Sequence, residues 1–162
     1  MEKMMSAQRK IADNELLIVR TYDAPPSVVF TLWSSAERMK RWMGPNNFIC
    51  PEATIDFRVG GAYRAMIKSA EHGENWFAGV YREIVPDKRL VFTFTWENEG
   101  PSAGIETLVT ITFEERDGKT VQTFHQAPFR NVERRDSHVG GWSEAFDKEA
   151  AYAEKIAKEH AA

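Results

Sequence analysis

The sequence predicts an α+β protein, a curved antiparallel sheet with a long C-terminal helix packed on its concave face. The chain of 162 residues is long enough for one domain with a substantial core and too short for two ordinary domains. Apolar residues alternate with a period of two through most of residues 53–126, whereas residues 137–159 have the period of an amphipathic helix. We therefore expect one domain at residues 15–160, preceded by a polar tail at residues 1–14.

The first part of this domain predicts one strand and two short helices. The apolar stretch "ELLIVRTY" at residues 15–22 forms the strand. Pro25 and Pro26 fit the entry of the first helix, because the N–H groups of a first helical turn have no partner within the helix. The second short helix, "AERMKRWM" at residues 36–43, ends at a Gly-Pro pair.

Alternation of apolar and polar residues predicts five or six further strands from six candidate segments. They lie at residues 53–59, 62–69, 75–85, 89–96, 105–115 and 119–126. Gly60 and Gly61 stand between the first two of these strands and indicate a two-residue hairpin turn. Together with the helical spacings, the alternation predicts a set of mostly buried side chains, namely Phe30, Trp33, Phe92, Phe94, Ile111 and Trp142.

The last helix is predicted to begin at Ser137, a residue type favoured as N-cap. At 100° per residue, one stripe of this helix carries Trp142, Phe146, Glu149, Ala153 and Ile156. Gly140 and Gly141 each weaken a helix by about 1 kcal/mol relative to alanine. We therefore expect the helix to approach the sheet closely at these two glycines.

Charge and composition exclude several classes of partner. The net charge of −3 and the pI of about 5.8 give no reason to expect nucleic acid or an anionic membrane surface. Cys50 is the only cysteine, which excludes an internal disulfide and a cysteine zinc site. No apolar run has the length of a membrane span or of a signal peptide, so we expect a cytoplasmic protein. No cofactor is expected, and nothing in the sequence excludes a homodimer.

Two local patterns resemble catalytic or metal sites. The segment "GWSEA" around Ser143 approaches the G-x-S-x-G pattern of a hydrolase nucleophile. Polar residues precede it and its last glycine is replaced by alanine, so we favour Ser143 on the solvent side of a helix. His125 and His138 lack the spacing of a helical metal motif, and only the fold could bring them together with a carboxylate, so we expect no metal.

The segment "RNVERRD" concentrates three arginines, Arg130, Arg134 and Arg135. Such a cluster is a candidate for binding phosphate. Glu133 and Asp136 are interleaved with the arginines and the whole chain is acidic. A solvated loop is therefore the favoured interpretation.

Several segments together resemble the SRPBCC, or START-like, superfamily. They are "DAPPSVVFTLWSSAERMKRWMGP", "DFRVGGAYR", "GVYREIVPDKRLVFTF" and "HVGGW". The nearest branch is similar to the C-terminal domain of the activator of heat-shock protein 90 ATPase, the AHSA type. The resemblance implies a helix-grip fold, in which the sheet wraps the last helix, and a cavity between them that often holds an apolar small molecule. This branch has no shared catalytic motif, so the resemblance supports a pocket but no reaction.

Candidate ligand-binding residues follow from the faces predicted to point into this cavity. They are Trp33, Trp42, Trp76, Phe92, Phe94, Trp96, Phe113, Gln122, Phe146, Glu149 and Ala153. The aromatic members line a cavity or fill an ordinary core, and the core is the simpler interpretation for each one alone.

Glu149 is the candidate that departs most from the resemblance, since similar proteins usually have leucine-like residues at Glu149 and Ala153. Ala153 leaves space and Glu149 places an acid in it. We predict that the carboxyl points inward, bonded to Gln122 or to water, with a raised pKa. The alternative is that Glu149 reaches out to solvent at the edge of the stripe, since glutamate is rarely buried without a partner.

Three functions are compatible with these features. The first is a domain that binds a small apolar or amphipathic ligand, oriented by Glu149 and Gln122. The second is a cyclase-type or hydrolase-type enzyme with Glu149 as general acid or base. The third is a co-chaperone that activates a chaperone ATPase. It is the weakest of the three, because only the C-terminal type of domain is present.

Overall fold

The computed structural model of the protein describes residues 11–97 and 104–161. Most of the predicted polar tail and most of the predicted loop at residues 97–104 therefore lie outside the described residues. The elements in chain order are β1 (Leu16–Tyr22), α2 (Pro26–Ser34), α3 (Ala36–Met39), β2 (Ile49–Ile55), β3 (Ala62–Ser69), β4 (Gly73–Val85), β5 (Arg89–Trp96), β6 (Thr107–Arg116), β7 (Lys119–Ala127) and α4 (Val132–Ala161).

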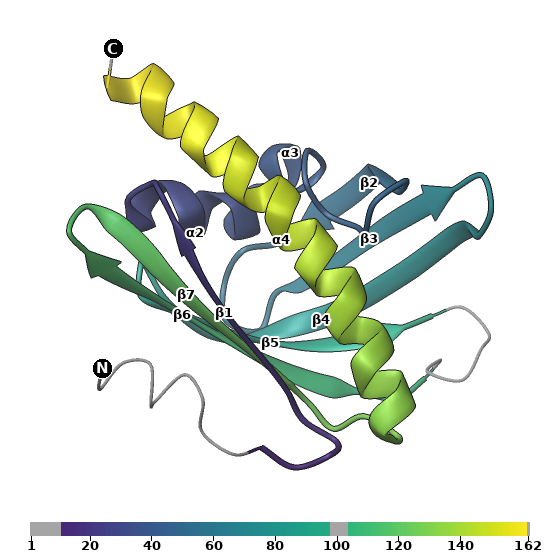
Figure 1. The fold of residues 1–162 in the computed structure, drawn as a ribbon. Helices are drawn as coiled ribbons and strands as arrows, with labels where there is room; N and C mark the ends of the chain where they lie inside the picture. Colours follow the sequence, from purple (N-terminus) through teal and green to yellow (C-terminus); the bar gives the residue numbers. More distant parts are fainter. Residues whose placement is uncertain (1–10, 98–103, 162) are drawn as a thin grey trace.

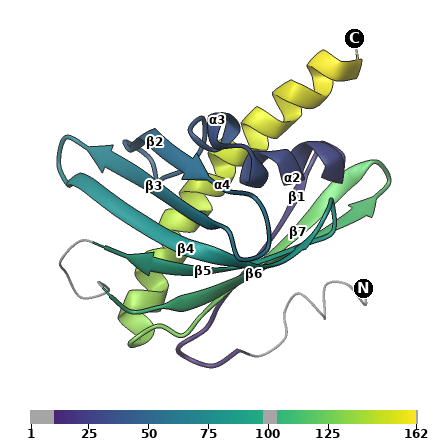
Figure 2. The ribbon, with the colours of Figure 1, turned by 180° about the vertical axis from the view of Figure 1, so that it is seen from behind.

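The strands form one antiparallel sheet in the order β1-β7-β6-β5-β4-β3-β2, so that β1 and β2 are its edges. The sheet is curved, and α4 runs diagonally across its concave side (Figure 1). The short helices α2 and α3 cover the same side beside α4, and the view from behind shows the other face of the sheet (Figure 2). The predicted α+β fold, with its curved sheet, two short helices and long last helix, is confirmed.

The first hairpin differs from the prediction. Strand β2 ends at Ile55 instead of beginning near there, and Ile55 pairs with Tyr63 across the turn. Residues 56–61 form a longer connection with its own backbone bonds, such as Gly61 N to Arg58 O at 2.8 Å. A Cβ on Gly61 would lie 2.0 Å from the carbonyl oxygen of Asp56, which explains why glycine is needed in this connection.

Helix α4 begins at Val132, five residues before the predicted start. The side chain of Asn131 accepts a hydrogen bond from Arg134 N at 2.9 Å, which is the contact of an N-cap, and Ser137 lies inside the helix. The predicted close approach at the two glycines is wrong. A Cβ on Gly140 would meet nothing within 4 Å, and one on Gly141 would meet only Pro45 Cγ at 3.6 Å.

The core lies between the sheet and the three helices. All six side chains predicted to be buried are at most 7% exposed. The stripe of α4 from Trp142 to Ile156 is also buried throughout, and Glu149 and Ala153 are completely inaccessible. The helical period therefore identified the inward face of α4 correctly, although its first residue was misplaced.

Gly140→Ala should raise the free energy of unfolding by about 0.5–1 kcal/mol, because Gly140 lies in an exposed part of a helix and a methyl group there meets no other atom. Urea unfolding of the two proteins measures the difference. Gly79→Ala is the matched control, since its Cβ would lie 1.8 Å from Thr93 O, and it should destabilise the protein strongly. A Gly140→Ala protein less stable than wild type would contradict the absence of close packing there.

Candidate functional site

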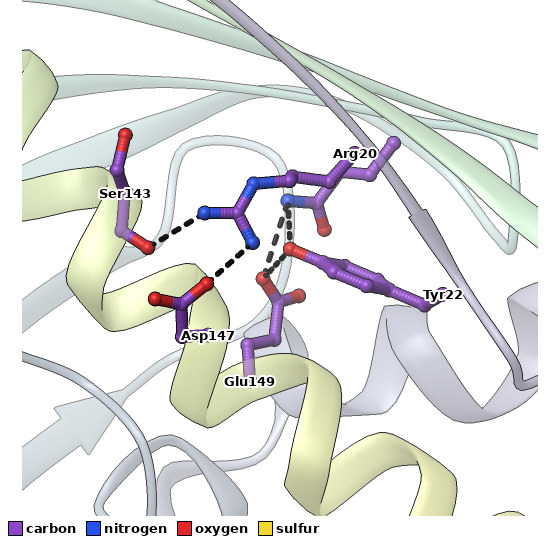
Figure 3. Close-up of polar contacts among 6 residues, drawn as sticks. Arg20, Tyr22, Ser143, Asp147 and Glu149 are labelled. Carbon is purple, nitrogen blue, oxygen red and sulfur yellow. Dashed lines mark hydrogen bonds and ion pairs between the residues drawn. The ribbon is translucent and has the colours of Figure 1, made fainter.

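A buried carboxyl group, that of Glu149, joins four elements of the fold. Its Oε1 accepts hydrogen bonds from Tyr22 OH at 2.8 Å and from Gln122 Nε2 at 3.2 Å. Its Oε2 accepts from Trp33 Nε1 at 3.0 Å. Tyr22 belongs to β1, Trp33 to α2, Gln122 to β7 and Glu149 to α4. We call these four residues the carboxyl cluster; Figure 3 shows Tyr22 and Glu149 within it.

Burial raises the pKa of Glu149 to about 8, although the hydrogen bonds from Tyr22, Gln122 and Trp33 act in the opposite direction. Removal from water penalises the ionised form, and three donors offset only part of that penalty. Burial and the nearby Glu149 also raise the pKa of Tyr22 well above its usual value. The predicted inward acid, its bond to Gln122 and its raised pKa are therefore confirmed.

Arg20 lies beside the carboxyl cluster on β1 and holds α4 from the edge of the sheet (Figure 3). Its Nη1 donates to Asp147 Oδ1 at 2.8 Å and its Nη2 to the backbone oxygen of Ser143, also at 2.8 Å. The positive charge of Arg20 acts to lower the pKa of Glu149, but less than burial raises it. Ser143 lies in the middle of α4, so the strand-turn-helix of a hydrolase nucleophile is absent at this serine.

A small cavity, which we call the inner cavity, lies among α2, α3, α4 and strands β3–β5. Its volume is about 10 Å³, which is room for one water molecule. Its lining residues are Trp33, Met39, Met43, Tyr63, Phe77, Tyr81, Phe92, Phe94 and Trp142. The two methionines come from α3 and from the residues just after it, and every other lining residue is aromatic.

A second cavity, which we call the outer cavity, lies near the start of α4 and also has a volume of about 10 Å³. Its lining residues are Phe94, Trp96, Ile105, Thr107, Gln126, Pro128, Phe129, Arg130 and His138. Phe94 lines both cavities. Gln126 accepts from Trp142 Nε1 at 2.9 Å and donates to Thr107 Oγ1 at 2.9 Å, so its amide is satisfied within the protein.

The structure distributes the candidate ligand-binding residues over several places. Trp33, Phe92 and Phe94 line the inner cavity, Trp96 lines the outer cavity, and Gln122 and Glu149 belong to the carboxyl cluster. The five other candidates line neither cavity. Trp42 and Phe146 pack against Trp33, Phe113 packs against Phe30, Ala153 is fully buried, and Trp76 is half-buried under the guanidinium of Arg64.

Sequence reasoning missed several residues of these sites. Tyr22 was recognised only as the end of a strand, and its distance from Glu149 in sequence hid the contact. Met39 and Met43 were placed in a short helix, but the direction of their side chains was not predicted. Tyr63 and Tyr81 share the inward faces of β3 and β4 with Phe77, so the period of two could have identified them.

The histidines are engaged separately. His125 lies 2.7 Å from Glu15 Oε1 through its Nε2. His138 accepts from Trp96 Nε1 at 3.0 Å and its Nδ1 lies 2.7 Å from Arg134 O. Within residues 11–97 and 104–161, no three histidine, cysteine, aspartate or glutamate side chains come together as a metal site. No helix in the same ranges is long and apolar enough to cross a membrane.

A family model described as Activator of Hsp90 ATPase homolog 1-like protein matches residues 23–154, and the chain belongs to this family. The AHSA-type, START-like resemblance of the sequence is thereby confirmed. A search of curated proteins found no match.

Solved structures with the same fold include protein CV1439 from Chromobacterium violaceum, with a TM-score of 0.79 and 24% identity over 88% of this chain and 99% of that one. The AHSA1 protein from Silicibacter pomeroyi has a TM-score of 0.75 and 22% identity over 90% of this chain and 99% of that one. DynU16, a protein of the dynemicin biosynthetic locus, has a TM-score of 0.70 and 19% identity over 88% of this chain and 48% of that one. At these identities the likeness shows the fold alone.

Glu149→Gln should flatten the dependence of stability on pH. The folded pKa of about 8 exceeds the usual 4.5, so the folded state holds this proton more tightly than the unfolded chain. The stabilisation is complete below pH 4.5 and is lost as the pH rises through 8, with an upper limit of about 5 kcal/mol. The difference in unfolding free energy between wild type and Glu149→Gln should therefore fall between pH 5 and pH 9.

Urea unfolding at five pH values across this range measures the effect. Glu159→Gln is the control, since it removes an exposed carboxylate from the same helix and should give a curve parallel to wild type. Parallel curves for Glu149→Gln and wild type would show that the buried acid has no raised pKa.

Proposed function

We propose that this protein binds a small apolar or amphipathic molecule in the inner cavity. The observation that supports this most is the lining of the cavity. Every lining residue is aromatic or methionine, which is the composition of sites for apolar ligands.

Three residues of this lining, Trp33, Tyr63 and Trp142, donate their polar hydrogens to other groups of the protein. Tyr63 OH donates to Thr93 O at 2.7 Å. Trp33 Nε1 donates to the carboxyl cluster, and Trp142 Nε1 donates to Gln126. A molecule in the cavity therefore meets ring faces and methionine side chains, and its apolar surface leaves no polar group of these residues without a partner.

The cavity must expand before it holds a ligand, because binding pockets usually have volumes of about 300 Å³ or more. Met39 and Met43 are suited to move, since methionine is unbranched and adapts its shape at low cost. Helix α3 has only four residues, so it is a single turn with little internal cooperativity. The opposite wall consists of paired strands and is much stiffer.

The segment after α3 is fastened to α4 by two side chains. Glu144 accepts from Asn46 N at 2.9 Å, and Lys148 Nζ donates to Pro45 O at 3.2 Å and to Phe48 O at 3.4 Å. These exposed or half-buried contacts are easier to break than the buried carboxyl cluster. We therefore expect α3 and residues 44–48 to move outward when the cavity expands, and α4 to stay in place.

Met43→Ala should strengthen the binding of a neutral apolar probe, N-phenyl-1-naphthylamine, by about tenfold, which corresponds to about 1.4 kcal/mol. The shorter side chain removes the need to displace the methionine. Titration with excitation of tryptophan measures binding, because Trp33 and Trp142 line the cavity and should transfer energy to the bound probe.

Met66→Ala is the matched control. Met66 is as buried as Met43, at 3% and 4% exposure, but it does not line the inner cavity. Both variants should lose a similar part of their stability, about 2–5 kcal/mol, and circular dichroism verifies that each remains folded. The proposal fails if wild type and Met43→Ala do not bind the probe, or if Met66→Ala strengthens binding equally.

A further inference from the structure

The outer cavity differs from the inner cavity in carrying a charge. Arg130 is the one arginine, lysine, aspartate or glutamate among the described residues that line the two cavities. Burial lowers the pKa of His138. Its Nε2 accepts a hydrogen bond from Trp96, which requires that this nitrogen carry no proton.

The guanidinium of Arg130 is exposed and has no ion pair or hydrogen bond within residues 11–97 and 104–161. Two other arginines of the chain are paired: Arg20 binds Asp147, and Arg64 binds Glu97 through several contacts of 2.8–3.1 Å. An unpaired guanidinium beside a cavity lined partly by apolar side chains is free to bind an anion from solution by donating hydrogen bonds to it.

The surroundings of Arg130 add to the positive potential. The charge of Arg134 acts on His138, which lines the same cavity, so this second arginine is close. The first turn of α4 begins two residues after Arg130, and the N-terminal end of a helix favours an anion. Of the acids in this segment, Asp136 is paired with Arg135 at 2.7 Å, and Glu133 is exposed in the first turn.

We propose that the ligand is an amphipathic organic anion whose charged group binds Arg130 at the outer cavity. Its apolar chain or ring then passes Trp96 and Phe129 and reaches the inner cavity beside Phe94, the residue that the two cavities share. This inference rests on the proposed function, because it assigns the two ends of the same ligand. The apolar lining disfavours a free inorganic anion, which would bury no apolar surface.

Octanoate and 1-octanol distinguish the charged group from the chain, since they differ mainly in the carboxylate. Each is used to displace N-phenyl-1-naphthylamine from wild type and from Arg130→Gln at pH 7.5. The substitution should weaken octanoate binding by about tenfold and leave 1-octanol binding unchanged. Added salt should weaken octanoate binding to wild type, because a rim charge is screened.

Two further variants complete the experiment. Arg130→Lys keeps the charge and should retain most of the octanoate affinity. Arg82→Gln removes an exposed arginine that lines neither cavity, and it should behave as wild type.

The inference is overturned if Arg130→Gln leaves octanoate binding unchanged, or if it weakens octanoate and 1-octanol equally, which would make the role of Arg130 structural. If 1-octanol displaces the probe and octanoate does not, the proposed function stands and the anionic ligand is wrong. If the protein binds neither the probe nor octanoate nor 1-octanol, the proposed function fails as well.

Discussion

The position of α4 against the sheet depends on one buried carboxyl group. A buried acid without partners costs several kcal/mol, so the donors of Tyr22, Trp33 and Gln122 must all be in place when Glu149 is enclosed. A shift of α4 by one turn, about 5.4 Å, would replace Glu149 by an alanine and leave these donors without their acceptor. The carboxyl cluster therefore specifies the register between the helix and three other elements.

The direction of Glu149 was predictable, whereas its partners were mostly not. Helical and strand periods alone place Glu149 and Gln122 on inward faces, and these periods do not depend on tertiary detail. The donors Tyr22 and Trp33 come from parts of the chain more than 100 residues away, and their contact depends on how α2 and β1 pack. The start of α4 was misplaced because Ser137 and Asn131 are both good N-caps, and only the structure decides between them.

The size and position of the inner cavity could not be predicted from the sequence either. Ala153 does leave space along the stripe, but neighbouring side chains close in, and Ala153 lines neither cavity. The free space instead lies beside Met39 and Met43, and its volume is the small difference between large packed volumes. The hairpin turn at Gly60 and Gly61 was mispredicted because a two-residue turn and a longer connection can contain the same glycines.

Two shared residues connect the parts of the site. Trp33 belongs to the carboxyl cluster and lines the inner cavity, and Phe94 lines both cavities.

Glu149 and Arg130 have opposite roles in this part of the protein. Glu149 is enclosed, its pKa is raised to about 8, and both of its oxygens already accept hydrogen bonds from the protein. Because Glu149 lines neither cavity, a molecule in these cavities meets no acid there. Arg130 is exposed and unpaired among the described residues. The family match indicates no ligand, so the proposal of an anionic ligand rests on which of these two groups is left accessible.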